Sequence, residues 1–147
     1  MSGLQYFPIS KRVLEYVPLD ELDWSKLSGR KDILSLIVDY ADYINWSVLS
    51  EKIYFILDFD TLKKYKDRLD WHIVCQRKDF VFTNDILEQF CDYIDWTEAS
   101  SSLNINFTKA LVLKYTDKWN WPVLVKNKAF HNKLDISQFP YGRLLIS

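Results

Sequence analysis

The chain has 147 residues and a mass of 17.6 kDa, and its 48% apolar residues can fill the core of one domain. The net charge of -1 and the pI near 6.1 argue against nucleic acid as a partner, because binding to phosphate backbones needs clustered Lys and Arg. With only 3 glycines and 4 prolines, the chain has little material for the phosphate loops and strained turns of many enzyme sites.

Five tryptophans mark a tandem repeat that runs through most of the chain. The intervals between them are 22 residues once and 25 residues three times. These residues are Trp24, Trp46, Trp71, Trp96 and Trp121. Each follows an Asp or Asn, and an Asp lies four residues before every one of them. We predict one domain over residues 1–147, whose units span about 4–28, 29–53, 54–78, 79–103 and 104–128, with a C-terminal cap and tail at 129–147.

Each unit is predicted to contain a longer helix and then a shorter one. Asp58, Thr83 and Thr108 are the expected N-caps of the longer helix in three successive units. Apolar spacing carries the helix after Thr83 through Phe90 and Tyr93. The Asp or Asn before each Trp is expected to cap the shorter helix, of about two turns, because its oxygen can accept unpaired N–H groups.

The units must stack, because a pair of helices of this length cannot enclose its own apolar face. We therefore predict an all-α fold, a short, right-handed α-solenoid of about five helix–turn–short-helix repeats. The Trp column is the expected seam between successive units, since burial of an indole removes a large apolar surface from water. A first helix is expected to end at Tyr16, and Phe130 belongs to a truncated sixth helix.

The repeat pattern, aromatic-x-Asp-x-apolar-Asp/Asn-Trp-x-x-Leu-Ser, resembles the short Trp-containing tandem helical repeats of bacteria and large DNA viruses. The resemblance covers residues 4–127, with about 25 residues per unit. It implies a structural role for the motif and no enzymatic activity.

The Asp four residues before each Trp is the most regular polar feature. We predict that it accepts hydrogen bonds from backbone N–H groups or from an indole N–H. Replacement of Asp67 and Asp92 by Asn is then expected to lower the melting temperature. The alternative is a row of carboxylates that binds cations or a basic partner. The members are Asp20, Asp42, Asp67, Asp92 and Asp117.

Few residues are candidates for metal binding or catalysis. His72 and Cys75 have the spacing of a zinc clamp, but Cys75 occupies a column otherwise filled mostly by serine. Cys91 and His131 are the other soft ligands. Neither His lies in a nucleophile motif, so we predict no metal, no cofactor, no small-molecule substrate and no enzymatic activity.

The ends of the chain are the expected contact sites for a protein partner, because the repeat does not explain their apolar residues. The predicted partner-binding residues are Phe7, Tyr141, Leu144, Leu145 and Ile146. We predict protein–protein interaction or a structural subunit of a larger assembly, such as a capsid-associated protein of a large DNA virus. The alternative is a nucleic-acid-associated factor that uses the Lys/Tyr face from Lys63 to Arg68.

The expected location is intracellular and soluble, in the cytoplasm, or in the virion if the source is viral. No apolar run approaches the roughly 18 residues of a membrane span. The stretch from Met1 to Arg12 lacks the pattern of a secretory signal, and two cysteines are too few for a disulfide scaffold.

Overall fold

The structure is a computed structural model that describes residues 9–139. Every regular element in this range is a helix and none is a strand, which confirms the predicted all-α class. The chain divides into two compact units, Met1–Arg77 and Lys78–Ser147.

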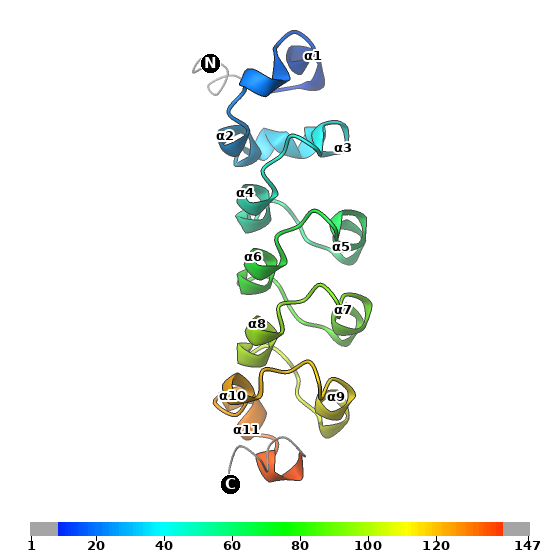
Figure 1. Cartoon of the computed structure of the whole chain (residues 1–147), viewed down its shortest axis with the longest axis vertical. Coiled ribbons are helices and arrows are strands. Elements are labelled where there is room, and N and C mark those ends of the chain that lie inside the picture. Colours follow the sequence, from blue (N-terminus) through cyan, green and yellow to red (C-terminus); the bar gives the residue numbers. More distant parts are fainter. Residues whose placement is uncertain (1–8, 140–147) are drawn as a thin grey trace. The chain divides into compact units, whose positions relative to one another are not determined.

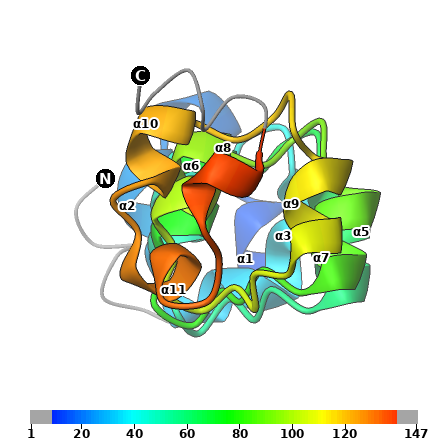
Figure 2. The same ribbon diagram turned by 90° about the horizontal axis from the view of Figure 1, so that it is seen from below.

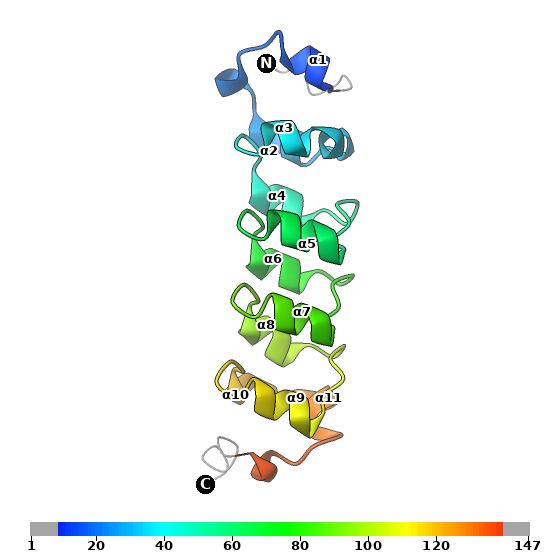
Figure 3. The ribbon, with the colours of Figure 1, turned by 90° about the vertical axis from the view of Figure 1, so that its right-hand side faces the viewer.

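The first unit contains a row of short helices that all begin at a repeat tryptophan. α2 packs beside α4, and α4 beside α6, while α3 and α5 form a second row (Figure 1; Figure 3). The elements are α1 (Lys11–Leu14), η2 (Leu19–Glu21), α2 (Trp24–Ser28), η3 (Lys31–Leu36), α3 (Ile37–Tyr40), α4 (Trp46–Glu51), α5 (Phe59–Tyr65) and α6 (Trp71–Gln76).

The second unit has the same arrangement of helix pairs, followed by two short helical elements. α8 and α10 pack together on one side, and α7 and α9 lie on the other (Figure 2). The elements are α7 (Asn84–Gln89), α8 (Trp96–Ser101), α9 (Lys109–Lys114), α10 (Trp121–Leu124), α11 (Lys128–His131) and η4 (Ile136–Gln138). The truncated helix predicted around Phe130 corresponds to α11.

Side-chain caps start the helices where the sequence predicts them. Thr83, Thr108 and Asp58 accept the amide three residues later and open α7, α9 and α5. The Asp or Asn before every repeat Trp caps the following helix in the same way. These residues are Asp23, Asn45, Asp70, Asp95 and Asn120.

The helix after Thr83 is shorter than predicted. α7 and α8 both have 6 residues, so the expected inequality is wrong in this repeat. α7 ends at Gln89 because Phe90, at φ -116 and ψ 26, has left helical geometry. The fully buried Phe90 side chain and the turn after it therefore replace the expected continuation to Tyr93.

A hydrogen-bond exchange explains why the chain turns before each Trp. Every repeat indole N–H donates to the carbonyl five residues earlier, at 2.8 to 2.9 Å. In a continuous helix that carbonyl would bind the amide of the capping residue. The amide of Asn120 instead donates to the Ser100 hydroxyl of the preceding repeat, at 2.9 Å. The amides of Asn45 and Asp70 donate in the same way to Ser28 and Ser50.

The indoles pack on aromatic residues of the following repeat. In the first unit the Trp46 ring lies 5.2 Å from the Tyr65 ring between centroids. In the second unit Trp96 lies 5.1 Å from Tyr115. Within each unit, the Trp column thus forms the expected seam.

A second buried column lies nine residues after each Trp. Its side chains are at most 5% exposed. The members are Ile33, Phe55, Phe80, Ile105 and Phe130.

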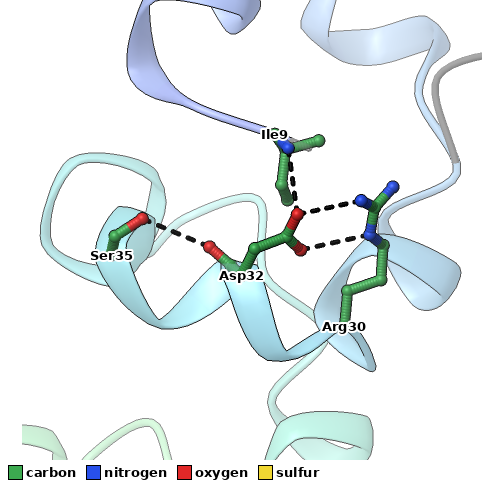
Figure 4. A network of polar contacts seen from close by, with 4 residues as sticks. All are labelled: Ile9, Arg30, Asp32 and Ser35. Carbon is green, nitrogen blue, oxygen red and sulfur yellow. Dashed lines mark hydrogen bonds and ion pairs between the residues drawn. The ribbon is translucent and has the colours of Figure 1, made fainter. Parts of the chain in front are cut away.

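Both described ends are attached to their own unit. Figure 4 shows that Asp32 accepts the Ile9 amide at 3.0 Å and both guanidinium bonds of Arg30, at 3.1 and 2.8 Å. At the other end, Phe139 is 1% exposed and its ring lies 5.8 Å from that of Trp121. Phe139 therefore covers the last repeat.

Candidate protein-interaction site

The predicted partner-binding residues fall outside the range that the structure describes. Phe7 precedes this range, and Tyr141, Leu144, Leu145 and Ile146 follow it. Phe139, just before the C-terminal group, is buried against its own unit. Within residues 9–139, a contact surface must be formed by exposed side chains.

The regular Asp column lies on the surface and does not bind the indole N–H groups, which was one of its two predicted roles. All five members are exposed, and the indole N–H groups donate to backbone carbonyls instead. Two members pair with a cation of the next repeat: Asp42 with Arg68 at 2.6 Å, and Asp92 with Lys118 at 3.7 Å. The side chains of Asp42 and Asp92 are 83% and 84% exposed, so these pairs contribute little to stability.

The four soft metal ligands differ in their burial. His72 is exposed on α6 and contacts Gln76, while Cys75 on the same helix is buried. The half-buried Cys91 thiol lies 3.7 Å from a carboxylate oxygen of Asp92. His131 is exposed on α11.

Several basic residues are engaged by neighbouring acids or rings. Lys114 lies 3.9 Å from Glu88 and 5.5 Å from the centre of the Tyr115 ring. In the predicted Lys/Tyr face, the Lys63 and Lys64 ammonium groups lie over the rings of Phe59 and Tyr65, at 5.9 and 5.4 Å. These contacts place the cations beside aromatic surface, where cation–π attraction is favourable.

The resolved pKa shifts have structural causes. Hydrogen bonds to Thr61 lower the pKa of Asp58, and hydrogen bonds to Ser137 lower that of Asp135; both carboxylates cap helices. Burial and then the charge of Asp32 raise the pKa of Tyr54, whose hydroxyl donates to the Gly29 carbonyl. These shifts follow from capping and packing, without any need for a catalytic role.

Large apolar side chains are exposed in the segments between repeats. Ile53 and Leu103 are 71% and 67% exposed, and both lie seven residues after a repeat Trp. The other members of this column are lysines, so Lys and apolar residues alternate along the repeat. The complete column is Lys31, Ile53, Lys78, Leu103 and Lys128.

One of these exposed residues lines a groove of about 480 Å³ in the second unit. Leu103, Pro122 and Val123 form its apolar part, and Lys126 and Lys128 supply two ammonium groups. Its remaining lining residues are Ser101 and Asn127. No helical apolar stripe in the sequence points to this groove, because Leu103 lies in a loop. The alternation of Lys and apolar residues seven positions after each Trp was the sequence signal that could have indicated it.

Comparison with protein-family models, with curated proteins and with solved structures gives no significant match for this chain. Within residues 9–139, no helix has the length and apolar character needed to span a membrane.

Proposed function

We propose that the chain is a non-catalytic protein-interaction or structural module, built as a short α-solenoid of about five repeats. It would act as an adaptor or as a subunit of a larger assembly, such as a capsid-associated protein of a large DNA virus. Its location in this proposal is the cytoplasm, or the virion for a viral source.

The supporting observation is that polar side chains within each unit form hydrogen bonds to the backbone. The capping Asp and Asn residues, the Ser hydroxyls and the indole N–H groups bond to backbone groups of the same or the neighbouring repeat. No buried side-chain nitrogen or oxygen in residues 9–139 lacks a hydrogen-bond partner. Exposed apolar side chains such as Ile53 and Leu103 remain for contacts with other molecules.

The resemblance to Trp-containing tandem repeats supports the same proposal. Repeat proteins of this kind present extended surfaces made of equivalent loops. The alternating column that includes Ile53 and Leu103 is such a set of equivalent positions.

Affinity capture from native material tests the proposal. The full chain carries the bait tag, and a second bait ends at Phe139, so that this buried residue is kept while Tyr141 to Ile146 are removed. We expect the full chain to retain specific protein neighbours and the shortened chain to lose part of them. Recovery of no specific protein by the full chain would contradict the proposed function.

A nucleic-acid-associated factor is the second candidate, and the Lys63 and Lys64 side chains over aromatic rings are the observation in its favour. Arg68 in the same stretch is already paired with Asp42. Salt distinguishes the two candidates. Affinity for single-stranded nucleic acid falls steeply as ionic strength rises, whereas an apolar protein contact responds little.

A further inference from the structure

We propose that the groove around Leu103 docks a short acidic segment of a protein partner, with a leucine-like side chain of that segment seated between Leu103 and Val123. The inference rests on the proposed function and adds the chemistry of the partner. It is drawn from the second unit alone.

The groove has the size and rigidity of a side-chain binding site. Its volume of about 480 Å³ falls within the range of roughly 300–1,000 Å³ that is usual for ligand pockets. Asn127 forms part of its wall and is 5% exposed. The Asn127 amide donates to the Ser100 and Ser102 carbonyls at 2.8 and 2.7 Å, which holds α11 against the loop that carries Leu103.

The apolar part of the groove is open to solvent. Leu103 is 67% exposed, and Pro122 beside it is also exposed. An apolar side chain placed between Leu103 and Val123 would remove both from water, and burial of apolar surface favours binding. This part of the groove therefore accounts for a leucine-like residue in the partner.

The charge of the groove selects the residues that flank that leucine. Lys126 and Lys128 are exposed, and the groove has no carboxylate among its lining residues. Neither lysine takes part in an ion pair within residues 9–139, unlike Lys114 and Lys118 of the same unit. Carboxylates of a partner would meet two available cations, which favours an acidic segment over a neutral or basic one.

The segment at 140–147 has the wrong charge for this groove. It contains Arg143 and neither Asp nor Glu. An acidic segment from another protein matches the lysines better.

Peptide binding to the full chain tests the inference. The probe is a fluorescein-labelled peptide of two leucines flanked by glutamates, measured by anisotropy at low salt. Control peptides replace the leucines by serine or the glutamates by lysine. We expect a Kd on the order of 10–100 µM for the probe, since a single small groove supplies a modest free energy. Both control peptides should bind at least about fivefold more weakly.

Substitutions then locate the binding site. Leu103→Asp and the double variant Lys126→Glu with Lys128→Glu should each weaken the affinity for the probe peptide by at least about fivefold. Val81→Asp and Lys109→Glu are matched controls, because they change an exposed apolar residue and an exposed lysine of the same unit outside the groove. Circular dichroism checks that each variant is folded. If Leu103→Asp fails to fold, Leu103→Ser replaces it.

Three outcomes would overturn the inference: equal binding by wild type and the groove variants, preference for the lysine-flanked peptide, or a self-associating chain that the groove variants render monomeric. Capture with the double lysine variant separates this test from that of the proposed function. Unchanged neighbours would reject the groove and leave the proposed function standing. Absence of neighbours with the wild-type bait would reject the proposed function itself.

Discussion

Serine and tryptophan act as a pair at the junction between repeats. The Ser100 hydroxyl accepts the Asn120 amide at 2.9 Å and donates to the Trp96 carbonyl at 2.6 Å. The Trp121 indole N–H donates to the Thr116 carbonyl. In a continuous helix, the Asn120 amide would donate to that carbonyl instead. Both backbone groups are thus satisfied while the chain turns, as buried polar groups require.

Replacement of Ser100 by Ala should destabilise the protein by about 1–3 kcal/mol, because the Asn120 amide loses its acceptor in a site that is closed to water. Ser100 is fully buried. Its exposed neighbour Ser101, whose hydroxyl donates to the Glu98 carbonyl, is the matched control, and Ser101→Ala should change stability by less than about 0.5 kcal/mol. Denaturant unfolding followed by circular dichroism measures both. Equal losses would contradict the assigned role of the Ser100 hydroxyl.

Trp96→Phe should cost about 2 kcal/mol, whereas Asp92→Asn should cost less than about 0.5 kcal/mol. The first change removes the indole donor to the Cys91 carbonyl and part of the contact with Tyr115. The second removes only an exposed pair with Lys118. Thermal unfolding compares the two variants. A larger effect of Asp92→Asn would restore the structural role that its sequence position predicts.

The sequence predicts some of these residue roles and not others, for a physical reason. Capping depends on atoms within three residues, so Asn120 and Thr108 are assigned correctly from spacing alone. The partner of an indole N–H depends on how the chain turns. Regular spacing therefore pointed to the Asp column, although the true acceptors are backbone carbonyls. The buried column that includes Phe80 was missed because its members lie nine residues after each Trp, a spacing that belongs to no single helix.

At the scale of elements, the α-helices have only 4 to 7 residues in the range 9–139. Isolated helices shorter than about 12 residues are marginal in water, so these depend on packing and on their caps. This explains why the helix after Thr83 is predicted too long. Apolar spacing continues to Tyr93, but the helix ends before Phe90, whose side chain is buried and whose backbone is not helical.

The Asp58 cap of α5 makes stability depend on pH. Hydrogen bonds from the Thr61 side chain and amide lower the Asp58 pKa in the folded state. Because the folded pKa is depressed, the contribution is present above the unfolded value near 3.9 and is lost as pH falls through the folded pKa. Asp58→Asn keeps an acceptor for the amide but cannot titrate.

We therefore expect the melting temperature of wild type to fall more steeply than that of Asp58→Asn as pH decreases from about 5 to 2. Calorimetry over this range measures the two slopes. The Asp135 cap titrates in both proteins and cancels in the comparison. Parallel slopes would show that the Asp58 carboxylate gains nothing from its hydrogen bonds in the folded state.

At the scale of the whole molecule, the repeat pattern predicts that each repeat is stabilised by the repeats next to it. Within the first unit the helix contacts run from α2 to α4 and from α4 to α6, and within the second from α8 to α10. The all-α class followed from the sequence, because every repeat has the same capping signals.

A chain stabilised mainly by neighbouring repeats opens locally when one repeat is weakened. Leu124 is fully buried in α10, and its replacement by Ala should cost about 2–5 kcal/mol. Amide hydrogen exchange followed by NMR should then accelerate at Val112 and at the substituted residue 124, while Leu49 and Leu62 of the first unit keep their protection. Leu49→Ala, at an equally buried position in α4, is the reciprocal experiment and should reverse the pattern. Equal acceleration in both units would mean that the chain opens as a single cooperative core, which a stack of locally stabilised repeats does not predict.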